Sequence, residues 1–156
     1  MISIQHIHPI LVHFPIVFIL SLAAFDVIAV LRGATVTGRS IAGRISVAIA
    51  ILAGLSAAAT WIFGGVALDF AEAGGFSSDV AEIHEGLGTV TAIAFVVWAL
   101  LRAFAWWRDW QPGRGVQAVV ALVEVAGAIL VIATAYYGGQ LVYDLGVNVT
   151  KAAAGG

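Results

Sequence analysis

The sequence predicts an all-α integral membrane protein, a bundle of four transmembrane helices. Of its 156 residues, 62% are hydrophobic and only 10% are charged, which is more apolar surface than a water-soluble domain of this length buries. Four long apolar stretches are separated by short segments rich in turn-forming residues. Six of the seven basic residues lie in or beside alternate connections, a pattern typical of a chain that crosses a membrane repeatedly. We expect a single domain over residues 1–156.

The four expected spans cover about residues 10–31, 45–67, 84–104 and 116–140. Each is close to the roughly 20 apolar residues that cross about 30 Å of hydrocarbon as a helix. Backbone groups in lipid must be satisfied within their own element, so helices are expected and not open strands. The first twenty residues lack a basic region and a cleavage site of small residues, so we expect the first span to be retained.

The arginines predict the orientation of the bundle, because short cytoplasmic loops retain Lys and Arg. The first and third connections and their flanks carry six of the seven basic residues: Arg32, Arg39, Arg44, Arg102, Arg108 and Arg114. The segment before the first span and the second connection carry none, and Lys151 in the C-terminal tail is the exception. We therefore expect both termini on the non-cytoplasmic side, an arrangement written N-out/C-out.

This topology brings polar residues from distant parts of the chain to the outer end of the bundle. His13 and His84 are each expected about one turn inside a span, at similar depths on different helices. Two such imidazoles suit the axial ligands of haem b, and Gly88, one turn after His84, would leave room for the macrocycle. The residues expected at its polar rim are Tyr136, Gln140 and Tyr143.

Two other functions remain open on the same residues. His8, His13 and His84, with nearby carboxylates, would also suit a bare transition metal such as copper, zinc or iron. Alternatively, the polar end is a docking surface on a structural scaffold without a cofactor. Cysteine is absent, which excludes thiolate metal sites and covalent haem attachment. The few basic residues predict no nucleic-acid binding, and no nucleophile with its base or phosphate-binding loop is visible.

Asp26 and Glu124 lie inside the first and fourth spans, both in the expected cytoplasmic half. Charged groups at this depth are functional candidates, and contact between the two would indicate a proton path or a quinone site. Pairing with Arg44, or extension of the side chains toward the inner surface, is the structural alternative.

Three motifs resemble those of a widespread bacterial family of four-helix inner-membrane proteins of unknown function. They are an HPxxVHFP start at residues 8–15, an HExLG-like third helix at residues 84–88 and a YxGGxLVY end at residues 136–143. The resemblance covers nearly the whole chain and implies kinship with small b-type membrane cytochromes. It implies electron transfer near the periplasmic face of the bacterial inner membrane. Besides the lipid bilayer, the expected partners are a redox protein or a quinone, and a homo-oligomer is compatible with the sequence. The acidic residue expected after the paired glycines is Gln140 here.

Overall fold

The computed structural model describes residues 6–149, and every regular element within them is a helix. These elements are α1 (Ile7–Leu11), α2 (His13–Leu31), α3 (Ile41–Ala73), α4 (Asp79–Trp107) and α5 (Arg114–Tyr143). α1 and α2 form one span interrupted at Val12, so residues 6–149 contain four helical stretches long and apolar enough to cross a membrane. The predicted all-α, four-span architecture is confirmed, and each expected span lies within one of these stretches.

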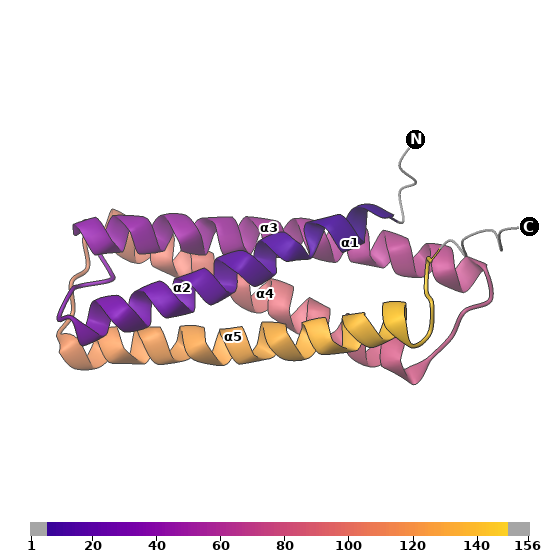
Figure 1. Ribbon diagram of the computed structural model, residues 1–156. Coiled ribbons are helices and arrows are strands. Elements are labelled where there is room, and N and C mark those ends of the chain that lie inside the picture. Colours follow the sequence, from indigo (N-terminus) through magenta and orange to yellow (C-terminus); the bar gives the residue numbers. More distant parts are fainter. Residues whose placement is uncertain (1–5, 150–156) are drawn as a thin grey trace, which may run out of the picture.

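The four long helices form a ring of antiparallel neighbours (Figure 1). α2 contacts α3 and α5, and α4 contacts the same two helices. α1 and the C-terminal end of α5 therefore lie at the same end of the bundle (Figure 1). The 33 residues of α3 span about 50 Å at 1.5 Å per residue, which exceeds the hydrocarbon thickness of about 30 Å. The helix ends thus reach the interfacial regions.

Prolines and hydroxyl caps set several helix boundaries. Pro15 has no backbone N–H to donate to the carbonyl of Leu11, which explains why the helix is interrupted at Val12, between α1 and α2. Ser40 accepts a hydrogen bond from the backbone N–H of Gly43 at the start of α3. Ser78 accepts one from Val80 and starts α4 at Asp79.

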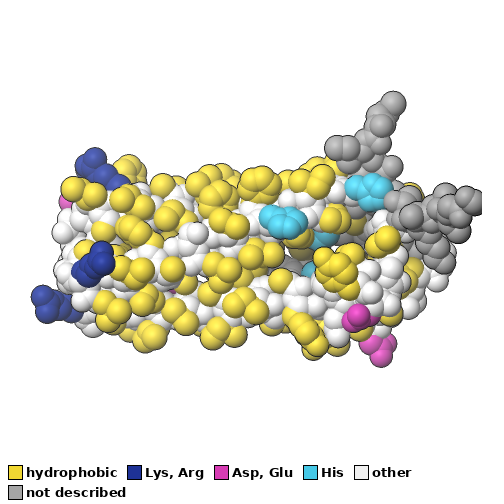
Figure 2. Space-filling view, viewed as in Figure 1, with side chains coloured by type: hydrophobic (Ala, Val, Ile, Leu, Met, Phe, Trp, Pro, Cys, Tyr) yellow, Lys and Arg dark blue, Asp and Glu magenta, His cyan; other side chains and the backbone are white. Residues whose placement is uncertain are grey.

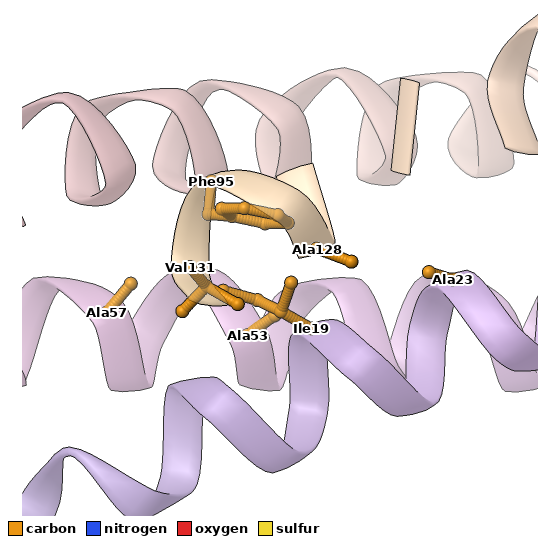
Figure 3. Packing of buried hydrophobic residues seen from close by; sticks show 7 residues of the cluster. All are labelled: Ile19, Ala23, Ala53, Ala57, Phe95, Ala128 and Val131. Atoms are coloured by element: carbon orange, nitrogen blue, oxygen red, sulfur yellow. The ribbon is translucent and has the colours of Figure 1, made fainter. Parts of the chain in front are cut away.

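Small side chains let the helices approach closely in the middle of the bundle. Ile19, Ala53, Phe95 and Val131 belong to one buried cluster whose side chains converge from four helices (Figure 3). A Cβ added to Gly54 would lie 2.8 Å from the Cβ of Ala99, so α3 and α4 are in near-backbone contact there. Large apolar residues cover the outside, as expected for a surface that faces lipid.

The two halves of the bundle are related by an internal repeat. Ile-His-x-x-Leu occurs at residues 7–11 and again at 83–87, and Ala-Thr-x-x-x-Gly-Gly occurs at 59–65 and again at 133–139. The interval from His8 to His84 also separates buried Ile19 from buried Phe95. In the register that aligns the second motif, each buried residue of α5 coincides with a buried residue of α3. Helices α1–α3 and α4–α5 are therefore equivalent helical hairpins.

Charge distinguishes the two ends of the bundle (Figure 2). We call them the histidine end, which holds His6, His8, His13 and His84, and the arginine end, which holds Arg32, Arg39, Arg44, Arg108 and Arg114. At the arginine end, the side chain of Gln111 and the backbone N–H of Arg39 both donate to the Asp109 carboxylate. These hydrogen bonds hold the pKa of Asp109 below its usual value.

Candidate functional site

His8 of α1 and His84 of α4 meet at the histidine end of the bundle. Their ring centroids are 6.2 Å apart, and the ring planes are inclined at 72°. Both side chains are only partly exposed. Since the two residues occupy equivalent positions in the internal repeat, the pair joins one helical hairpin to the other. We call His8 and His84 the histidine pair.

Each ring is oriented by a hydrogen bond of the same kind, from Nδ1 to a backbone carbonyl oxygen. Nδ1 of His8 donates to the carbonyl oxygen of Thr60 on α3 at 3.0 Å, and Nδ1 of His84 donates to that of Thr134 on α5, also at 3.0 Å. Because a carbonyl oxygen only accepts, Nδ1 carries the hydrogen in each ring. In the neutral imidazole this leaves the Nε2 lone pair of each histidine available as a ligand.

Glycines make room for both rings. Gly64 and Gly138 lie one turn after the two threonines, on the helix faces that the imidazoles contact. A Cβ at Gly64 would lie 3.0 Å from Cε1 of His8, and a Cβ at Gly138 would lie 2.8 Å from Cε1 of His84. The Thr-x-x-x-Gly spacing of each hairpin thus supplies both the hydrogen-bond acceptor and the space for one imidazole.

The expected pairing of His13 with His84 is not observed. Its side chain is exposed, and its Nδ1 donates to the carbonyl oxygen of Ile10 in the preceding helix α1, at 3.3 Å. The five residues from His8 to His13 turn a helix by about 500°, so the two side chains point about 140° apart. Since His8 faces the bundle interior, His13 faces outward. His6 is engaged elsewhere, with Nε2 3.3 Å from the backbone oxygen of Asn148.

The other predicted site residues surround this end of the bundle. Gly88 lies one turn after His84, and no other side chain or helix comes within 4 Å of the place its Cβ would occupy. Tyr136 and Tyr143 are largely exposed on α5. The amide of Gln140 reaches the Tyr136 hydroxyl at 3.5 Å. At 100° per residue, these three residues point about 160° away from Thr134 and Gly138, the α5 residues that contact His84, so they lie on the outer face of the helix.

The ligand set predicted for a bare metal ion is not assembled. Among residues 6–149, no three side chains of His, Cys, Asp or Glu gather closely enough to hold a metal ion. His8 and His84 supply two nitrogens, but His13 points away from them. The structure therefore offers two protein ligands at this end where the sequence suggested three or more.

A second polar cluster is buried toward the arginine end. Nη1 of Arg102 donates to Oδ2 of Asp26 at 2.9 Å and also to Oε1 of Glu124, while Nη2 donates to the backbone oxygen of Val36 at 2.6 Å and to Oγ of Ser46. Ser46 itself donates to Oδ2 of Asp26 at 2.7 Å. We call Asp26, Arg102 and Glu124 the buried ion cluster.

Sequence reasoning placed Arg102 at the edge of a cytoplasmic connection and missed its role between Asp26 and Glu124. Arg44, considered there as the partner, instead donates from Nε to the backbone oxygen of Arg39. The internal repeat held the missing signal, since the interval from His8 to His84 also separates Asp26 from Arg102. Equivalent positions of the two hairpins carry opposite charges and meet inside the bundle.

Comparison with known protein families finds one match that covers most of the chain. The model of a family described as "Predicted membrane protein (DUF2231)" matches residues 5–151. Comparison with curated proteins and with solved structures finds no match.

Proposed function

We propose that this chain, which belongs to the DUF2231 family of predicted membrane proteins, binds one haem b between His8 and His84 and transfers electrons in the membrane. The observation that supports this is the histidine pair itself. Two imidazoles from different helices meet in a T-shaped arrangement, each with Nδ1 engaged by a backbone carbonyl and the Nε2 lone pair left as a ligand.

The spacing of the pair fits a shared metal centre. With metal–nitrogen bonds of about 2.0 Å, two imidazoles on opposite sides of one metal have ring centroids about 6 Å apart. The observed separation is 6.2 Å.

The number of ligands favours haem over a bare ion. Zinc sites in proteins use at least three protein ligands, and imidazole sites for other divalent transition metals are similarly crowded. The part of the chain described by the structure brings only His8 and His84 together, with no third metal-ligating side chain. A porphyrin supplies four nitrogens of its own, so two protein ligands complete its iron.

The surrounding residues suit the remainder of such a group. No other helix or side chain lies within 4 Å of the Cβ position of Gly88, so this flank of α4 is open. Tyr136, Gln140 and Tyr143 stay the residues predicted to hydrogen-bond the carboxylate substituents of haem, from the outer face of α5. When bound, haem supplies one-electron chemistry. The carbonyl oxygens of Thr60 and Thr134 would hold both imidazoles in one tautomer, with Nε2 of each ring as the ligand. A redox protein or a membrane quinone is the proposed electron partner.

The test is the visible spectrum, haem content and metal content of the detergent-purified protein, produced with adequate haem supply. We expect about one haem per chain, with the sharp bands of a low-spin cytochrome after reduction by dithionite. The variant with both His8→Ala and His84→Ala should remain in the membrane and lose the haem. Stoichiometric copper, zinc or iron without haem would support the metal-binding alternative and reject the proposal. Protein without any cofactor after haem titration would reject it as well.

A further inference from the structure

We propose that the buried ion cluster is a proton-binding site within the membrane, and that its proton resides on Glu124 and exchanges through a cavity between α4 and α5. This inference is independent of haem binding. It depends on the balance of buried charges, on two carboxylate oxygens without partners and on the place where the surface of the bundle is hollowed.

The charges of the cluster do not balance. Asp26, Arg102 and Glu124 are 0%, 4% and 1% exposed, and a guanidinium keeps its proton in a protein. Two ionised carboxylates and one guanidinium would leave one uncompensated negative charge inside the bundle. Such a charge is costly in a membrane unless it is neutralised.

No other described group facing the cluster compensates this charge. α3 contributes the hydroxyl of Ser46, the loop after α2 contributes the backbone oxygen of Val36, and α4 contributes the indole N–H of Trp98, which donates to Oε1 of Glu124 at 3.1 Å. All three are neutral. A bound proton is therefore the available compensation.

The internal repeat identifies Glu124 as the surplus acid. Asp26 and Arg102 occupy equivalent positions of the two hairpins and form a balanced pair. The position equivalent to Glu124 in the first hairpin is Ala50, at the interval that also relates Thr60 to Thr134. Glu124 therefore adds a carboxyl group for which the repeat provides no counter-charge.

The surroundings of the carboxyl oxygens also favour Glu124. Oδ2 of Asp26 and Oε1 of Glu124 each accept two hydrogen bonds, whereas Oδ1 of Asp26 and Oε2 of Glu124 are buried without a partner. Glu124 lines a cavity of about 230 Å³ between α4 and α5, together with Phe95, Trp98 and Gly127, and Asp26 does not line it. Of the two carboxyl groups, Glu124 is therefore the one that borders the cavity through which we propose the exchange.

Dicyclohexylcarbodiimide tests the proposal, because it partitions into membranes and reacts with protonated carboxyl groups. The acid O–H adds across one C=N bond: the proton goes to nitrogen, the carboxyl oxygen bonds to carbon, and the protein gains the mass of the whole reagent. We expect mass spectrometry of membranes treated at neutral pH to find the label on Glu124. Asp26→Asn should lower that labelling about tenfold or more, because Glu124 then becomes the sole, ionised partner of Arg102.

Two further variants complete the test. Glu124→Gln should remove the label and leave the protein folded, since the amide has the shape of the neutral acid. In the infrared spectrum, the wild type should show a protonated-carboxyl band at neutral pH that Glu124→Gln lacks. Undiminished labelling of Glu124 in Asp26→Asn would overturn the charge argument. Absence of both the label and the infrared band from the wild type would overturn the proposal as a whole.

Discussion

Replacing Arg102 with Met should destabilise the bundle more than replacement of any exposed arginine. The guanidinium connects all four long helices or their loops, through Asp26 on α2, Ser46 on α3, Glu124 on α5 and the backbone oxygen of Val36. Met has a similar length and leaves little cavity. The loss is therefore electrostatic, because two buried carboxyl groups lose their only cation.

Removing one partner of a buried ion pair costs about 3–5 kcal/mol, and the two neutral acceptors, Ser46 and Val36, each lose a hydrogen bond worth about 1 kcal/mol. Protonation of the carboxyl groups offsets part of this sum. We therefore expect Arg102→Met to lower the free energy of unfolding by about 4 kcal/mol near neutral pH.

Unfolding of the protein in mixed micelles by increasing sodium dodecyl sulfate, followed by circular dichroism, measures this difference. Arg32→Met is the control: this arginine is exposed, so its replacement should change the free energy by no more than about 0.5 kcal/mol. Combining Arg102→Met with Asp26→Leu and Glu124→Leu should recover most of the loss, because apolar groups replace the whole cluster. Equal stabilities of Arg102→Met and Arg32→Met would refute the reasoning.

Gly138→Ala should lower the free energy of unfolding by about 1–3 kcal/mol. The new Cβ would lie 2.8 Å from Cε1 of His84 and push the ring away from the carbonyl oxygen of Thr134. The same unfolding assay should find Gly139→Ala neutral or slightly stabilised, since its Cβ would meet only Tyr143 at 4.0 Å; equal losses in both variants would contradict the packing argument. At the arginine end, Gln111→Ala should raise the pKa of Asp109 toward its ordinary value. Because the pKa of Asp109 is lowered in the folded protein, any stability that this carboxylate contributes is present above its ordinary pKa and is lost as the pH falls. Carbon-detected NMR titration can measure the pKa of Asp109 in both proteins. An unchanged pKa in Gln111→Ala would exclude Gln111 as the cause of the lowered pKa.

The fold was predictable because length, hydropathy and turn residues all act locally along the chain. Each expected span lies inside an observed helical stretch. The orientation relative to the two sides of the membrane stays a prediction based on the arginines, because the helices alone do not distinguish one side from the other.

The site was predictable only as a location. Histidines from the first and third spans gather at one end, as expected, but helix phase decides which of them face inward. Pro15 drew attention to His13, whereas the side chain that enters the bundle is His8, which contacts Thr60 and lies against Gly64. That choice depends on a glycine more than fifty residues away in sequence, which local reasoning does not reach.

The buried ion cluster was missed for a different reason. An arginine near the end of an apolar stretch has the same local pattern whether it extends to the membrane surface or turns inward. Only its partners distinguish the two cases, and these lie on other helices. The repeated Ile-His-x-x-Leu motif was visible in the sequence, and its interval would have aligned Asp26 with Arg102.

The reduced-minus-oxidised spectrum of single histidine variants tests the central claim most directly. His8→Ala and His84→Ala should each lose the low-spin spectrum, whereas His13→Ala should keep it, because the His13 side chain is exposed and is not part of the histidine pair. A wild-type spectrum in His8→Ala together with its loss in His13→Ala would contradict the account.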